Sequence, residues 1–290
     1  MLDKKMHTFA LLATTGSYTA TAQQLFLTQP AITLQIKALE AELGLALVSY
    51  QHAQLHFTAA GQQLARYINK TDHESQKLLD QLKAPTKKRS LTLGCTRSLS
   101  SFLLADVLHQ LQSQRKNIQC QIGNTNTILK ALTAGDIDFG LVEGNFDKSQ
   151  YDFVTLRREP FIGVTYANNP LLAATQPLSL TALLAQTLLV RESGSGTREI
   201  FQNWLTMQNA RITDFQQVIE IATPTPLIQL LTSGVGISFM YRSLVTAELA
   251  QGKLVELPLR GFDLQHEINL VYLKNSYFAA QYQAIAAQIN

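Results

Sequence analysis

Apolar residues recur every three or four positions along the first third of the chain, a spacing typical of amphipathic helices. Met6, Phe9 and Leu12 form the apolar face of a first helix, which is expected to end near Gly16. A second, short helix is expected over Thr19–Phe26. The pattern therefore predicts a helical N-terminal segment with short connections.

A third helix is expected after Thr28, whose hydroxyl suits an N-cap, with Pro30 just inside the helix where its missing N–H costs little. Its apolar face is formed by Ile32, Ile36, Leu39 and Leu43. Two short extended runs, residues 45–48 and 55–58, then flank a polar tip at residues 49–54. Three helices and a β-wing predict a mostly α winged helix-turn-helix.

The outer face of the third helix carries amide, hydroxyl and ammonium groups, which suit the base edges and phosphates of a DNA major groove. Spacing alone also allows an ordinary helical hairpin with a solvated polar face. We expect Gln29, Thr33 and Gln35 to read bases, and Thr28 and Lys37 to contact phosphate. The full set of candidate DNA-binding residues is Tyr18, Thr19, Thr28, Gln29, Pro30, Ala31, Thr33, Leu34, Gln35, Lys37 and His52.

The first sixty residues resemble the LysR-type transcriptional regulators. The matching residues include Phe9, Gly16–Thr19, Thr28–Ala31, Gln35–Ile36, Leu39–Glu40, Glu42–Gly44, Leu55–Thr58 and Ala60–Gly61. The resemblance implies that residues 1–58 are a domain that binds a partly palindromic site in double-stranded DNA as a homodimer or homotetramer, with RNA polymerase as a further candidate partner. Two departures from the family pattern predict either weaker phosphate binding or binding that depends more on dimer geometry: Leu34 replaces a common arginine, and the wing tip Ser49–His52 lacks arginines.

One long helix is expected from Thr58 to Lys83, so residues 59–84 are assigned as a linker helix and 85–90 as a hinge. Its apolar residues lie at near-heptad spacing: Leu64, Tyr67, Ile68, Leu78, Leu79 and Leu82. Such a stripe indicates a dimerisation helix. The alternative is a helix packed on its own chain.

After the hinge, strands and helices alternate, which predicts a parallel α/β fold over residues 91–290. Strands are expected at 91–95, 118–123, 139–143, 187–191, 218–222, 237–240 and 267–273, and helices at 99–112, 127–134, from 197, at 227–232 and at 277–289. Two lobes follow, lobe I at about 91–163 and 266–290 and lobe II at about 164–265. This order is similar to the LysR-type effector domain, which resembles a periplasmic binding protein.

Residues 95–98 and 193–198 each follow a strand and open a helix, so hydroxyls, backbone N–H groups and the charge of Arg198 favour an anion clamp. The alternative is that these serines and glycines only turn the chain. The candidate effector-binding residues are Thr96, Ser98, Asn124, Thr125, Glu143, Ser193, Ser195, Thr197 and Arg198. Similarity to regulators of carbon fixation and of sulfur or cysteine metabolism implies a small anionic effector.

Three further features of this region bear on the effector site or on the chemistry near it. Glu143 either selects a cationic group on a zwitterionic effector or faces solvent. Pro224 and Pro226 predict an atypical pocket wall. Cys95 and Cys120 are expected to be buried structural residues, with a redox pair as the alternative.

Composition narrows the function class. The 290 residues are 46% hydrophobic and 16% charged, as in globular proteins, and the net charge is only +3. No apolar run spans a bilayer and no signal peptide is evident, so a cytoplasmic protein without membrane contact is expected. No cofactor, metal or catalytic-triad motif is present, so an enzyme is not expected. The remaining alternative is a cytoplasmic small-molecule-binding protein with weakened or lost DNA binding.

Overall fold

The computed structural model describes residues 3–51, 54–83, 89–173 and 177–289. The chain divides into two compact units, which we call the N-terminal unit (residues 1–87 with 133–136) and the C-terminal unit (88–132 with 137–290). His52 and Ala53 of the polar wing tip, residue 84 at the end of the expected linker helix and residues 85–88 of the expected hinge lie outside the described residues.

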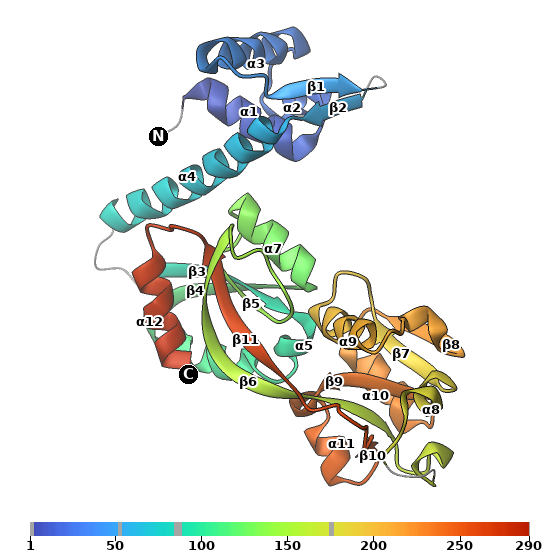
Figure 1. The fold of residues 1–290 in the computed structure, drawn as a ribbon. Helices are drawn as coiled ribbons and strands as arrows, with labels where there is room; N and C mark the ends of the chain where they lie inside the picture. The colour runs from blue at the N-terminus through green and yellow to red at the C-terminus, as the bar shows by residue number, and fades with distance from the viewer. Residues whose placement is uncertain (1–2, 52–53, 84–88, 174–176, 290) are drawn as a thin grey trace. The chain divides into compact units, whose positions relative to one another are not determined.

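The N-terminal unit is a winged helix-turn-helix, as predicted (Figure 1). Its elements are α1 (Lys4–Thr15), α2 (Tyr18–Gln24), α3 (Gln29–Leu43), β1 (Val48–Gln51), β2 (Gln54–Phe57) and α4 (Ala59–Lys83). The predicted apolar faces meet in one core, in which Phe9, Leu12, Ile32, Ile36 and Leu39 are buried. Burial of these side chains holds the helices of this unit together.

Local hydrogen bonds set where the helices begin and end. Thr28 caps α3, since its Oγ1 accepts the N–H of Ala31 at 3.4 Å, as expected. Helix α2 ends at Gln24, two residues earlier than predicted, because Phe26 adopts a left-handed φ of 54°. The next N–H, of Leu27, then bonds to the carbonyl of Ala22 at 2.9 Å and closes the helix end.

The wing is an antiparallel pair in which Val48 lies opposite Phe57. Four of the six residues that the sequence pattern assigned to the polar tip lie in these two strands, so the tip is shorter than predicted. The Glu40 carboxylate on α3 accepts the N–H groups of Leu47 at 2.7 Å and Val48 at 3.1 Å. This carboxylate therefore fixes the start of the wing to the third helix.

Helix α4 begins where expected, with the Thr58 hydroxyl accepting the N–H of Gly61 at 3.0 Å. Ala65 and Ile68 are buried in the core of the N-terminal unit, so the first part of the apolar stripe packs on its own chain. Tyr67 and Leu82 are exposed. Dimerisation through this outer part of the stripe stays a prediction.

Replacing Gly61 by alanine is expected to destabilise the N-terminal unit by about 2 kcal/mol. An added Cβ would lie 2.1 Å from the Leu47 carbonyl oxygen, which is backbone and cannot turn away. Helix propensity alone predicts the opposite sign, since alanine is favoured over glycine by about 1 kcal/mol. The change in the free energy of unfolding is measured by urea titration, with hydrogen exchange of the α1–α4 amides as the probe. Gln63→Ala, at an exposed position of the same helix, is the control. Unchanged or greater stability would refute the close contact.

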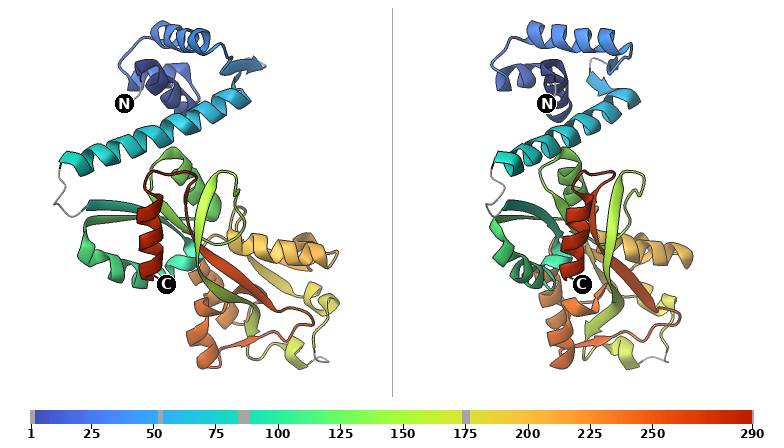
Figure 2. Two further views of the ribbon diagram at one scale, coloured as in Figure 1. Left: turned by 60° about the vertical axis from the view of Figure 1, so that its left-hand side comes forward. Right: turned by 90° about the vertical axis from the view of Figure 1, so that its left-hand side faces the viewer.

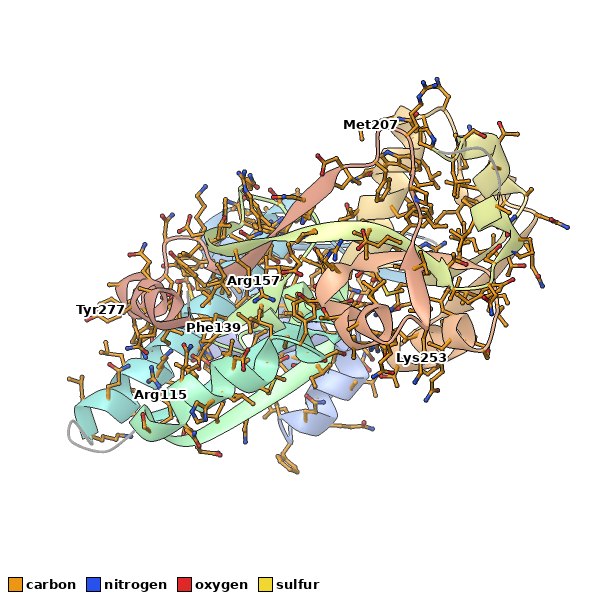
Figure 3. All side chains as sticks on the ribbon, turned by 90° about the horizontal axis from the view of Figure 1, so that it is seen from below. Arg115, Phe139, Arg157, Met207, Lys253 and Tyr277 are labelled. Carbon is orange, nitrogen blue, oxygen red and sulfur yellow. The ribbon has the colours of Figure 1, made fainter. Side chains whose placement is uncertain are left out.

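The C-terminal unit has two α/β lobes (Figures 1 and 2). Lobe I contains β3 (Arg89–Thr96), α5 (Arg97–Ser100), α6 (Leu104–Leu111), β4 (Arg115–Gly123), α7 (Thr125–Ala134), β5 (Phe139–Val142) and α12 (Ala279–Ile289). Lobe II contains α8 (Leu180–Leu184), β7 (Thr187–Arg191), α9 (Gly196–Met207), β8 (Gln217–Ile221), α10 (Pro224–Thr232), β9 (Ile237–Tyr241), α11 (Thr246–Ala250) and β10 (Leu254–Glu256). Figure 3 shows Tyr277 and Met207 at opposite ends of this unit.

Two long strands, β6 (Tyr151–Tyr166) and β11 (Leu264–Leu273), run antiparallel to each other and belong to both lobes. Through them the strands form one ladder in the order β4-β3-β5-β11-β6-β9-β7-β8, with β10 on β6. The sheet is thus mixed, whereas the sequence pattern predicted a parallel one. The reason is that the two crossing strands traverse the lobes in opposite directions.

The expected helix over residues 99–112 is in fact two helices. After α5 the chain turns before α6 begins at Leu104. The hydroxyls of Ser100 and Ser101 both donate to the Arg97 carbonyl, at 2.9 and 3.2 Å. Serine side chains that bond to nearby carbonyls compete with helical hydrogen bonds, which accounts for the break.

Candidate functional site

A strip of polar and apolar side chains lies along the outer side of α3, and we call this strip the recognition face. It is a shallow groove lined by Gln29, Pro30, Thr33, Leu34 and Lys37. Leu34 is 70% exposed in its middle. The spacing of these residues places them on one side of the helix, with the buried Ile32 and Ile36 turned away.

Other candidate DNA-binding residues lie around this face in different roles. Thr19 on α2 donates to the Gln29 side-chain oxygen at 3.4 Å. Gln35 accepts from the buried Thr8 hydroxyl at 2.6 Å, so the structure directs its carbonyl to α1 and not to the recognition face. Tyr18 packs against the core, where burial raises its phenol pKa to about 12. Ala31 is half-buried beside the Thr28 cap.

Positive charge near the recognition face is sparse among the described residues. Lys37 is exposed on the face itself. Lys5 forms ion pairs with Asp3, at 3.3 Å, and with Glu42. Few cationic side chains near this face are therefore available for contacts with phosphate.

In the C-terminal unit, polar side chains from both lobes meet where β3, β5 and β7 end. Arg191, the last residue of β7, is only 4% exposed and donates to the Ser98 hydroxyl at 2.9 Å. Ser98 and Thr197 hydroxyls are 2.9 Å apart, and Thr197 donates to the Glu143 carboxylate at 3.3 Å. Because Thr197 has one hydroxyl proton, Ser98 is the donor to Thr197. Hydrogen bonds therefore run in one direction from Arg191 through Ser98 and Thr197 to Glu143, and we call this chain of hydrogen bonds the relay.

Glu143 is 1% exposed and does not face solvent. Its second carboxylate oxygen accepts a hydrogen bond from the Thr96 hydroxyl. Burial raises the pKa of this carboxyl, and Thr96, Arg191, Thr197 and Ser98 act in the opposite direction by favouring the charged form. The site thus holds an acidic group at one end of the relay and a guanidinium at the other.

Backbone contacts also join the two lobes. The Gly196 N–H donates to the Thr125 hydroxyl at 3.1 Å, and the Asn126 N–H donates to the Gly194 carbonyl at 3.3 Å. A Cβ on Gly196 would lie 2.4 Å from the Glu143 carbonyl oxygen. Glycine is therefore needed at position 196 for the lobes to approach this closely.

The structure places the two arginines of lobe II differently from the expectation. Arg198 donates to the Arg191 carbonyl at 3.0 Å and pairs with Glu220 at 2.5 Å, so its guanidinium is not part of the relay. Arg191 takes the position that the sequence pattern assigned to Arg198. Glu192 accepts two hydrogen bonds from the Arg191 guanidinium, at 2.9 and 3.2 Å, and pairs with Arg97 at 2.5 Å.

The remaining candidates lie beside this cluster. Asn124 donates to the Ser193 carbonyl at 3.4 Å across the lobes. Ser195 is buried, and its hydroxyl is among the described groups that have no hydrogen-bond partner. An unpaired buried hydroxyl is costly, so a ligand oxygen there would be stabilising.

A pocket adjoins the relay, with the polar groups of Ser98, Arg191 and Thr197 on one side. Its apolar lining is Pro224, Leu227, Phe239, Met240 and Leu244. The cavity measures only about 10 Å³, because the lobes are closed on each other. Pro224 is one of the two prolines expected to alter the pocket wall.

The two cysteines are free; Cys95 is buried as expected, whereas Cys120 is only partly buried. Their strands are neighbours, with Leu93 opposite Cys120 and Cys95 opposite Ile122. Burial raises the pKa of both thiols, that of Cys120 to about 11. Both are therefore protonated and weakly nucleophilic at neutral pH, which favours the structural interpretation.

No group of three or more His, Cys, Asp or Glu side chains in the described part of the chain is arranged to hold a metal ion. None of the helices in that part is long and apolar enough to cross a membrane.

A winged helix-turn-helix joined to a two-lobed α/β unit with a polar cluster between its lobes defines a ligand-responsive DNA-binding regulator. Residues 4–62 match the bacterial regulatory helix-turn-helix protein, lysR family, and residues 85–290 match the LysR substrate binding domain. The chain belongs to the LysR family of transcriptional regulators.

Similar curated proteins are also regulators. The chain is 28% identical to the HTH-type transcriptional regulator CbbR of Xanthobacter flavus, over 89% of this chain and 78% of that one. It is 29% identical to the HTH-type transcriptional activator CmpR of Synechocystis, over 92% of this chain and 88% of that one.

Solved structures share the fold. ArgP from Mycobacterium tuberculosis superposes with a TM-score of 0.75 at 17% identity, covering 100% of this chain and 98% of that one. The Synechocystis CcmR regulatory domain in complex with 2-PG superposes with a TM-score of 0.60 at 19% identity, covering 69% and 95%.

Proposed function

We propose that this regulator binds a small molecule with an anionic group between its two lobes, and that lobe closure on this effector alters DNA binding. The observation that carries the proposal is the hydrogen-bonded relay from Arg191 through Ser98 and Thr197 to Glu143, which joins the lobes through buried polar groups. A buried guanidinium is a strong partner for carboxylate, sulfur oxyanion or phosphate. The solved CcmR domain carries 2-PG, which supports the same class of ligand.

The rest of the mechanism belongs to the same proposal. Gln29 and Thr33 read bases, Lys37 contacts phosphate, and the exposed part of the α4 stripe pairs two subunits so that their recognition helices meet successive major grooves of a partly palindromic site. Effector binding biases how dimers assemble into a tetramer, with a coupling free energy of about 1–3 kcal/mol. The protein works in the cytoplasm without catalysing a reaction, and RNA polymerase is its further partner.

Arg191→Met is expected to weaken anion binding more than tenfold, because the variant loses the one guanidinium in the relay. Thermal stabilisation of the full-length protein by sulfate, phosphate and 2-phosphoglycolate measures the change. Arg191→Lys, which keeps the charge, should retain part of the response.

Arg158→Met is the matched control, and it tests whether the anion binds at a different place in the C-terminal unit. Arg158 is exposed, pairs with Glu267 and lines a separate cavity of about 400 Å³ with Lys148, Phe153 and His266. Anion binding lost in Arg158→Met and kept in Arg191→Met would move the effector to that cavity and contradict the proposal.

A further inference from the structure

The charges around the relay are balanced among the described residues. Arg97 and Arg191 supply two positive groups, and Glu192 and the ionised form of Glu143 supply two negative groups. The neighbouring pair of Arg198 and Glu220 is neutral by itself. A simple anion entering this cluster would leave an excess of buried negative charge, which is costly in a water-poor site.

The relay also has a polarity that a ligand must match. Arg191 offers hydrogen-bond donors at one end, and Glu143 offers only acceptors at the other when ionised. In this structure the hydroxyls of Ser98 and Thr197 lie between Arg191 and Glu143. The Ser98 hydroxyl accepts a hydrogen bond from Arg191, and the Thr197 hydroxyl donates one to Glu143. A ligand that replaces these two hydroxyls therefore needs an acceptor at one end and a donor at the other.

We propose that the effector is a zwitterion of the α-amino-acid type, with its carboxylate or other anionic group at Arg191 and its ammonium group at Glu143. This inference rests on the proposed effector site and narrows the class of molecule that enters it. An ammonium group compensates the buried Glu143 carboxylate, and the ligand adds no net charge to a balanced cluster. Thr96, which donates to the other Glu143 oxygen, holds the carboxylate in position.

The test compares probe pairs that differ only in the amino group, in which the amino compound is a net-neutral zwitterion: L-alanine with propionate, L-serine with 3-hydroxypropionate, and taurine with ethanesulfonate. Calorimetry on the full-length protein gives the affinity of each. We expect at least one amino compound to bind at least tenfold more tightly than its amine-free partner, and no amine-free compound to be preferred.

Glu143→Gln should reduce that preference below twofold, since glutamine keeps the size of the side chain and removes its charge. Glu199→Gln is the matched control, because Glu199 accepts from Asn145 outside the relay. The comparison within the wild-type protein remains decisive even if Glu143→Gln does not fold.

The inference is overturned if amine-free members bind as well as their partners or if no amino compound binds. Amine-free binding that is lost in Arg191→Met would keep the anion site while rejecting the zwitterion. Binding that is indifferent to both Arg191→Met and Glu143→Gln would reject the proposed site as well.

Discussion

Gly196→Ala is expected to hold the two lobes apart and to abolish the effector response while DNA binding persists. The added Cβ would lie 2.4 Å from the Glu143 carbonyl oxygen and 2.8 Å from the Thr125 hydroxyl. Opposite it, Gly144 has a left-handed φ of 84°, and a Cβ there would lie 2.7 Å from the Gly196 Cα. Overpacking of this kind costs about 1–3 kcal/mol, which shifts an open–closed equilibrium by about fivefold to about 150-fold.

Hydrogen exchange measures this shift directly. The Asn126 and Gly196 amides, which donate across the lobes, should exchange about tenfold faster in the variant. Gly252→Ala is the control, because its Cβ would meet nothing within 4 Å and adds only local backbone strain at a φ of 66°. Unchanged protection of both amides in Gly196→Ala would show that closure does not depend on this contact.

Leu34→Arg is expected to tighten DNA binding on the order of hundredfold at low salt. A charge-assisted contact contributes about 1.5 kcal/mol, and a dimer would gain two of them, one for each recognition helix. Leu34 is exposed between Thr33 and Lys37 on the recognition face, so an arginine there needs no repacking.

The salt dependence of the DNA affinity distinguishes a new phosphate contact from a general increase in the positive charge of the protein. Each added contact should steepen the slope of log K against log salt by about 0.9, hence about 2 for the dimer. Leu43→Arg adds the same charge on the opposite side of α3, nine residues further along the helix, and should change the slope much less. Equal slopes for wild type and Leu34→Arg would mean that position 34 does not face the DNA backbone.

The order of elements was predictable because hydrophobic periodicity is a local property. The expected strand at 187–191 is β7 with the same bounds, and the α3 cap at Thr28 follows from residue chemistry alone. The full length of β6 was not predictable, since it includes Pro160 and charged residues whose burial changes as the strand passes between lobes. Its pairing with β11 is a long-range contact that local spacing does not encode.

The polar cluster was predicted in part. Ser98, Glu143 and Thr197 meet as the strand ends suggested, because carboxyl ends of neighbouring strands share one edge. The prediction that Arg198 belongs to this cluster was wrong. Helical spacing could have shown this, because Thr197 and Phe201 form the buried side of α9 and position 198 turns outward. The role of Arg191 depends on which face of β7 meets lobe I, which only the tertiary structure decides.

The most direct measurement is binding of the purified protein to pooled genomic fragments over a salt series, with Gln29→Ala/Thr33→Ala as the paired variant. A ligand-responsive regulator predicts enrichment of fragments that share a two-fold symmetric motif, lost in the variant whose fold is otherwise intact. The absence of any enrichment by the folded wild-type protein at low salt would contradict the account and leave small-molecule binding in the C-terminal unit as the function.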